Sequence, residues 1–102
     1  MSTLPNFPGS GMAITLGRAY HSVMSDLELV IEAREAARSG RGTATREAAG
    51  LSRAELARAA GLNDATVSRY ESGRRVPQGD SAIRYARILR KIEAKLGARA
   101  AA

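Results

Sequence analysis

The chain has 102 residues, with 16 lysines and arginines against 10 aspartates and glutamates, a formal net charge of +6. This length suffices for one small helical domain with a modest core. The absence of cysteine excludes a disulfide framework and a thiolate zinc site. No apolar run reaches membrane length and the first 25 residues lack a secretion-signal pattern, so we expect a cytoplasmic location, in a bacterium or a phage-infected host, and no membrane partner.

The charge is unevenly distributed along the chain. Residues 1–37 carry two basic and four acidic side chains, whereas residues 38–102 carry 14 basic and six acidic ones. A basic segment suits a partner rich in phosphate, such as nucleic acid. A charged helix is more often only a solvated face, so the imbalance needs support from a motif.

Residues 1–25 contain several prolines and glycines and show no sustained period, which predicts a flexible or loosely docked N-terminal arm. The single His21 falls in this arm and is interpreted as an ordinary side chain. A helix is predicted to begin near Met24 and to end by Gly40. Its apolar stripe is expected to follow the helical spacing of Leu27, Val30, Ile31 and Arg34.

A short helix is predicted from about Thr43 to Ala49. Ser52 and Glu55 then have the spacing of a capping box, which predicts a further helix starting near Arg53. Gly61 suits the end of that helix, because glycine adopts a positive φ at a helix terminus and permits a tight turn.

Asn63 has the residue type and position of a cap for the next helix, with Leu62 and Val67 at the spacing of a hydrophobic staple. Gly73 supplies the stop signal. Val67 and Tyr70 are expected to face the first motif helix. Two short helices joined by a tight turn make a helix-turn-helix, the unit that places its second helix in the DNA major groove.

The last helix is predicted from about Ser81 to Leu96, followed by a frayed tail over residues 97–102. Its apolar side chains form a wide stripe. They are Ile83, Tyr85, Ala86, Ile88, Leu89, Ile92 and Leu96. This is more apolar surface than one small core needs, so either the first helix or a second subunit is expected to cover the excess.

From about Glu28 to Leu96 the chain resembles the repressor-type helix-turn-helix domains related to lambda and 434 repressor and Cro, the XRE family. The diagnostic runs are Gly50-Leu-Ser-x-x-Glu-Leu-Ala-x-x-Ala-Gly61 and Thr66-Val-Ser-x-Tyr-Glu-Ser-Gly73, with Pro77 and Tyr85-Ala-Arg-x-Leu89 downstream. The resemblance implies an all-α, compact five-helix domain over residues 26–96, with the motif at 52–73 and double-stranded DNA as the partner.

The resemblance also implies which side chains meet DNA. The base-reading set lies on the recognition helix, residues 64–72. It comprises Asp64, Ala65, Thr66, Ser68 and Arg69. Arg69 is the candidate for a bidentate contact to guanine, or alternatively a phosphate clamp. Asp64 either stabilises the helix start or accepts a hydrogen bond from a cytosine amino group.

Phosphate contacts are expected from residues that border the recognition helix or begin the first motif helix. They are Arg53, Asn63, Ser72, Arg74 and Arg75, with Arg41 as a weaker candidate. The family often pairs an arginine before the motif with a glutamate near the end of the recognition helix. The matching positions are Arg46 and Glu71, so a structural, partly buried ion pair is predicted.

The resemblance further implies a transcriptional regulator, a repressor or Cro-like protein of bacterial or phage origin, without a cofactor or small-molecule ligand. A homodimer on a pseudo-palindromic operator is expected, joined through the last helix or the acidic first helix. The first predicted helix, from near Met24 to Gly40, is an addition to the family pattern. A monomer is the alternative if this extra helix seals the core. A second functional hypothesis is a protein-binding adaptor, such as an antitoxin or phage protein, that engages its partner through residues 26–38. No catalytic constellation or metal site is apparent, so an enzyme is not expected.

Overall fold

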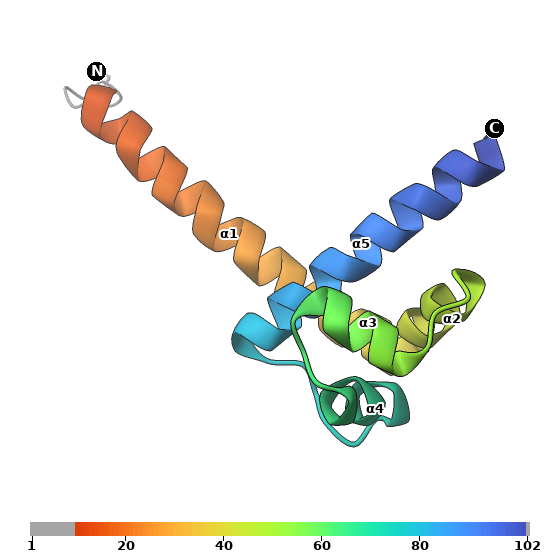
Figure 1. The fold of residues 1–102 in the computed structure, drawn as a ribbon. Coiled ribbons are helices and arrows are strands. Elements are labelled where there is room, and N and C mark those ends of the chain that lie inside the picture. Colours follow the sequence, from red (N-terminus) through yellow and green to blue (C-terminus); the bar gives the residue numbers. More distant parts are fainter. Residues whose placement is uncertain (1–9, 102) are drawn as a thin grey trace.

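The computed structural model describes the backbone of residues 10–101 and the side chains of residues 25–100. Five helices follow one another along the chain (Figure 1). They are α1 (Ser10–Ser39), α2 (Arg41–Ala48), α3 (Arg53–Ala60), α4 (Asp64–Ser72) and α5 (Gly79–Ala101). Residues 10–101 contain no strand, so the predicted all-α, five-helix fold is confirmed.

The two motif helices begin where their caps predict. At the start of α3, the backbone N–H of Ser52 donates to Glu55 Oε1 at 2.8 Å, and the backbone N–H of Glu55 donates to Ser52 Oγ at 3.0 Å. At the start of α4, Asn63 Oδ1 accepts from the backbone N–H of Thr66 at 2.8 Å. Each cap satisfies backbone donors that have no partner inside the helix.

Gly61 turns the chain between α3 and α4 with φ 75°, the left-handed conformation that favours glycine. The turn lets the inner faces of the two helices meet. Leu56, Val67 and Tyr70 are buried there, and the Tyr70 ring lies edge-on against Tyr85 of α5 with 5.0 Å between centroids. The expected burial of Val67 and Tyr70 is therefore confirmed.

The first helix, α1, differs from the prediction in its start and in its buried face. It begins at Ser10, not near Met24. Its buried side chains are Leu29, Ala33 and Ala36. The predicted stripe was wrong at Leu27 and Ile31, which are 50% and 64% exposed, whereas Val30 is partly buried against the core. Leu29, Ala33 and Ala36 also share one helical face, and two alanines let the backbones of packed helices approach closely.

The predicted arm over residues 1–25 is therefore helical from Ser10 onward, while residues 1–9 lie outside the described residues, as does the side chain of His21. Flexibility or loose docking of this segment stays a prediction. At the other end, α5 begins at Gly79 and continues beyond the predicted end at Leu96 to Ala101.

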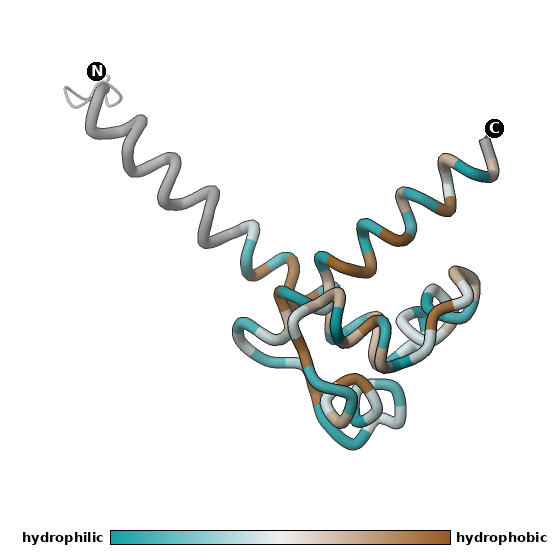
Figure 2. Tube along the Cα trace, viewed as in Figure 1, coloured by the Kyte–Doolittle hydropathy of each residue, from teal (hydrophilic) through white to brown (hydrophobic). Residues whose placement is uncertain are grey.

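The apolar stripe of α5 is divided between the core and the neighbouring helices. Tyr85, Ala86, Leu89 and Ile92 are buried. Ile83, Ile88 and Leu96 are partly buried against the same core. Teal and brown alternate along the helix in Figure 2, as expected when one side faces the core. Much of the apolar surface of α5 is covered by α1. The first helix was one of the two covers that the sequence allowed, the other being a second subunit.

Polar contacts also fasten α1 to the domain. Arg90 of α5 donates through Nε to Glu32 Oε1 at 2.9 Å, and Arg34 Nε donates to the backbone carbonyl of Pro77 at 2.9 Å. Beyond these contacts α1 and α5 diverge, so that their free ends lie far apart above the motif helices (Figure 1). The extra helix is thus a fixed part of the domain at its C-terminal end.

Candidate nucleic-acid interface

The recognition helix α4 has an inner and an outer face. Its inner side chains pack against α3 and α5, with Val67 and Tyr70 fully buried. The outer face exposes four of the five predicted base-reading residues, which the helical repeat places together. They are Asp64, Ala65, Ser68 and Arg69. This face is therefore free to enter a groove.

Thr66, the fifth predicted base-reading residue, lies on the other side of the helix. It is only 9% exposed, and its backbone N–H is held by Asn63. Burial weighs against a base contact by this side chain. The sequence pattern pointed to Thr66 because it is near the helix N-terminus, but its angular position on the helix turns it inward.

Exposed cations border this outer face. Arg74 and Arg75 follow the helix directly, and Arg69 lies on it. No ion pair joins these three arginines to a carboxylate in the part of the chain with described side chains. Because no described carboxylate pairs with these three arginines, their positive charges are available to an external anion such as a phosphate group.

The other predicted phosphate contacts lie at the helix starts and ends around α4. Asn63 caps α4 with its side-chain oxygen, so its amide NH₂ is not used by the cap and can donate elsewhere. The hydroxyl of Ser72 donates to the carbonyl of Arg69 at 3.3 Å at the end of the same helix. Both residues are exposed.

Arg46 and Glu71 lie together at the end of the recognition helix. Arg46 Nε donates to Glu71 Oε2 at 2.7 Å, and Arg46 Nη2 donates to Glu71 Oε1 at 3.1 Å, which is a bidentate pair. Arg46 Nη1 also donates to the carbonyl of Leu51 at 2.8 Å. One guanidinium therefore connects α2, the loop before α3 and the end of α4.

Arg53 also contacts Glu71, a bond that the sequence analysis did not predict. Its Nε donates to Glu71 Oε1 at 2.9 Å, and its side chain is about half exposed. Burial acts to raise the pKa of the Glu71 carboxyl, but the hydrogen bonds from Arg46 and Arg53 outweigh it, so the pKa is lowered. Glu71 is consequently ionised at neutral pH and holds two arginines at the C-terminal end of α4.

A second cluster, also missed by the sequence analysis, lies on the opposite end of α2. Arg41 donates through Nε and Nη2 to Glu93 at 2.8 and 3.2 Å, and Thr45 Oγ1 donates to the same carboxylate at 3.0 Å. This pairing weakens the case for Arg41 as a phosphate contact. No local signal could reveal it, because Arg41 and Glu93 are 52 residues apart.

Other kinds of site find no support in the residues that the structure describes. There is no group of three or more His, Asp or Glu side chains placed to hold a metal ion. Within the same residues, every helix is too short or too polar to cross a lipid bilayer. The functional groups that cluster around α4 in the described residues are arginine guanidinium groups and hydrogen-bonding side chains.

Comparison with known proteins agrees with this geometry. A family model described as "Helix-turn-helix" matches residues 44–95, from within α2 to the last turns of α5 and about half of the chain. Neither the curated proteins nor the solved structures gave a match. The matched segment contains the capped helix pair, the buried side of α4 and its exposed outer face. The chain therefore belongs to the XRE family of helix-turn-helix proteins, which are DNA-binding regulatory domains and not enzymes.

Proposed function

We propose that the protein is a sequence-specific regulator of transcription that binds double-stranded DNA with α4 in the major groove. It acts as a repressor or Cro-like protein by occupying an operator, in a bacterial or phage-infected cytoplasm. One observation carries the proposal: the outer face of α4 is exposed and flanked by uncompensated arginines, while a buried ion pair holds the helix from behind. A rigidly held, exposed helix suits base reading.

Within this proposal Arg69 is the principal base-reading residue. A bidentate arginine contact to guanine discriminates against other bases by about 1–3 kcal/mol. Ala65 is placed to meet a thymine methyl group, and Ser68 to bond a base edge or a phosphate. Asp64 either offsets the positive start of α4 or accepts from a cytosine amino group. The buried Thr66 is left out of the reading set.

Phosphate contacts position this helix and supply most of the affinity. The proposed set comprises Arg53, Asn63, Ser72, Arg74 and Arg75, all of them exposed. Arg53 keeps this role although its Nε is bonded to Glu71, because its remaining guanidinium N–H groups can reach a phosphate. Glu71 thereby positions Arg53, in addition to its buried structural pair with Arg46.

We propose further that two copies bind a pseudo-palindromic operator as a homodimer. Leu27 and Ile31 are exposed one helical turn apart on α1, where neither serves the core of its own domain. A second copy that covers this pair would remove apolar surface from water, and two-fold symmetry would match two half-sites. This favours the acidic first helix over α5 as the dimer contact.

The same exposed pair supports the second candidate function, an adaptor that engages a different protein through residues 26–38. The oligomeric state separates the two proposals. Light scattering after size-exclusion chromatography is expected to give a dimer that Leu27→Asp with Ile31→Asp converts to a monomer. A wild-type monomer at high concentration would oppose the homodimer and favour the adaptor.

Selection of bound duplexes from a random pool tests the proposed function. Wild-type protein is expected to enrich one motif, and Arg69→Ala is expected to relax it at one base pair. Arg99→Ala removes the same charge near the far end of α5 and should leave the motif unchanged. If wild type enriches no motif, sequence-specific binding is refuted.

A further inference from the structure

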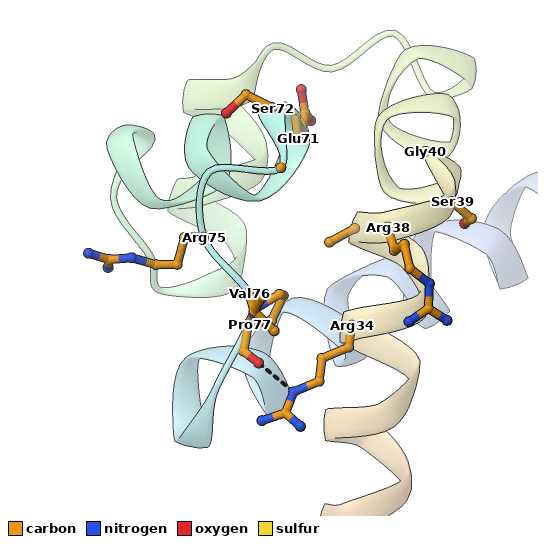
Figure 3. A pocket seen from close by; sticks show the side chains of 11 residues that line it. Arg34, Arg38, Ser39, Gly40, Glu71, Ser72, Arg75, Val76 and Pro77 are labelled. Carbon is orange, nitrogen blue, oxygen red and sulfur yellow. Dashed lines mark hydrogen bonds between the residues drawn. The ribbon is translucent and has the colours of Figure 1, made fainter.

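The connection between α4 and α5, residues 73–78, receives a hydrogen bond from the first helix. We call this connection the α4–α5 loop. Arg34 of α1 donates through Nε to the backbone carbonyl of Pro77 at 2.9 Å, the contact drawn as a dashed line in Figure 3. Pro77 is fully buried, whereas Arg34 is exposed. A surface side chain of α1 therefore reaches a fixed point in the loop.

The α4–α5 loop is held at two places. Near α4, the backbone N–H groups of Arg74 and Arg75 donate to the carbonyl of Arg69 at 2.9 and 3.2 Å. Two residues later, Pro77 has no backbone N–H to donate, and it is held through its carbonyl by Arg34. The segment that carries the two loop arginines is thus anchored by α4 on one side and by α1 on the other.

Open space separates the rest of the loop from α1. A hollow of about 530 Å³ lies between the last turn of α1 and the start of the loop. Figure 3 shows the Arg34 side chain reaching from α1 to Pro77, while the Arg75 side chain points away from α1. A hollow offers no packing atoms to the backbone beside it. The hydrogen bond from Arg34 therefore restrains the loop on the side where packing does not.

We infer that Arg34 is a positioning residue for DNA binding. Through the Pro77 carbonyl it holds the α4–α5 loop in the position in which the two loop arginines meet backbone phosphates. The inference rests on the proposed function, since it needs those arginines at DNA. A contact that is already in place before binding costs less conformational entropy when the complex forms. Because α1 ends at Ser39, before the matched residues 44–95, this restraint is an addition to the family domain.

Two substitutions separate the hydrogen bond of Arg34 from its charge. Arg34→Gln removes the charge but places an amide nitrogen as many bonds from the backbone as Nε, so it can still donate to the Pro77 carbonyl. Arg34→Met has a similar length and no donor. Arg34→Met is expected to weaken binding to the selected operator by about two- to tenfold, and Arg34→Gln should retain most of the affinity. Equal losses in both variants would show that the charge matters and would overturn the inference.

A double-mutant cycle tests whether Arg34 acts through the loop arginines. In protein that carries Arg74→Gln and Arg75→Gln, their phosphate contacts are absent, so the effect of Arg34→Met on operator affinity should disappear. The measurement is made at low salt, where the weakened binding remains detectable. Arg38→Met is the matched control, since Arg38 lies one turn later on α1 and pairs with Glu35. Its effect should be small and the same in both backgrounds, whereas an unchanged effect of Arg34→Met would overturn the inference.

Hydrogen exchange without DNA measures the loop directly. The N–H groups of Arg74 and Arg75 are expected to exchange faster in Arg34→Met than in wild type, while the N–H of Leu56 in α3 exchanges as before. The comparison between loop and α3 distinguishes a displaced loop from a general loss of stability. Unchanged exchange at both loop arginines would contradict the positioning role.

The outcomes separate this inference from the proposed function. If wild type enriches and binds an operator while Arg34→Met binds it equally well, in protein of normal melting temperature, the positioning role fails and the proposed function stands. Arg34 is exposed, so neither substitution should impair folding. If wild type binds no duplex, both fail.

Discussion

The short helix α2 is held by two arginine–carboxylate pairs that are alike in geometry and different in burial. Arg46 grips Glu71 with Nε and Nη2 at 2.7 and 3.1 Å, and Arg41 grips Glu93 with the same two atoms at 2.8 and 3.2 Å. The first pair has side chains 10% and 4% exposed, and both side chains of the second are 36% exposed. The bond lengths therefore do not indicate which of the two pairs contributes more to stability.

The difference in burial gives the two pairs different expected effects. In a buried pair, removal of one partner leaves the other charge without water or a counter-ion, whereas in a half-exposed pair water replaces the lost partner. The two pairs also hold different helices. Glu71 of the buried pair belongs to the recognition helix α4, whereas Glu93 of the more exposed pair belongs to α5. The buried pair thus holds α4 against α2, and the more exposed pair holds α5 against α2.

The largest expected effect comes from the buried pair. Glu71→Ala should lower the free energy of unfolding by about 3 kcal/mol, because the buried Arg46 then loses both of its charged hydrogen bonds and keeps, among carboxylates, only the longer, exposed contact to Glu47. Urea unfolding followed by circular dichroism measures the loss. Glu47→Ala is the matched control, since Glu47 lies 3.8 Å from Arg46 but is mostly exposed. Normal melting of Glu71→Ala would refute the structural role of the pair.

A substitution at Gly42 tests whether close packing, in addition to the ion pairs, holds α2 in its position. A Cβ atom at this position would collide with the hydroxyl of Tyr85 and lie 3.0 Å from its Cζ, and the Tyr85 ring is fully buried. Gly42→Ala should therefore destabilise the fold by about 2 kcal/mol through overpacking. Gly97→Ala is the control, because nothing lies near its Cβ, and it should be neutral or stabilising in thermal melts. Equal stability of the two variants would show that α2 can shift freely.

Glu93→Ala measures the more exposed pair directly. It should cost about 1 kcal/mol or less, and the cost should shrink as salt is added, because exposed charges are screened. Urea unfolding at two salt concentrations provides the measurement. A loss as large as that of Glu71→Ala would break the comparison and show that burial does not rank the pairs.

Acid titration gives the smallest effect and sharpens the same comparison. The pKa of Glu71 is lowered in the folded state, since the hydrogen bonds from Arg46 and Arg53 outweigh its burial. A carboxyl with a lowered folded pKa stabilises the fold above its ordinary value of 4.5, and this stabilisation disappears as the pH falls through the folded pKa.

Thermal melts from neutral pH down to about pH 3 should therefore show a smaller acid-induced loss of stability in Glu71→Gln than in wild type. Glu93, whose pKa is lowered chiefly by the hydrogen bond from Arg41, should give the same sign in Glu93→Gln. An acid-induced loss that is identical in wild type and in Glu71→Gln would show that the Glu71 carboxylate contributes nothing to stability.

Local signals account for the motif helices. Ser52 with Glu55, Asn63, Gly61 and Gly73 each act on a backbone within a few residues, so their pattern predicts the starts and ends of α3 and α4 without knowledge of the fold. The site residues on α4 came from the family resemblance combined with helical spacing. Thr66 shows the limit of that approach, because a shift of one position along a helix turns a side chain from the groove toward the core.

The extra helix shows what local signals leave open. Both Leu27 with Ile31 and Leu29 with Ala33 lie one turn apart, and the larger side chains made the first pair the expected core face. Packing against α5 selected the second pair, since the alanine lets two helices approach closely.

The amino-acid sequence thus contained the helix-turn-helix, its caps and the basic character of its surface, because these follow from neighbours in the chain and from composition. The face that α1 buries and the pairing of Arg41 with Glu93 arise only when distant segments pack together. Such contacts depend on which surfaces fit in three dimensions, and charge or hydrophobicity at a single position does not specify the partner.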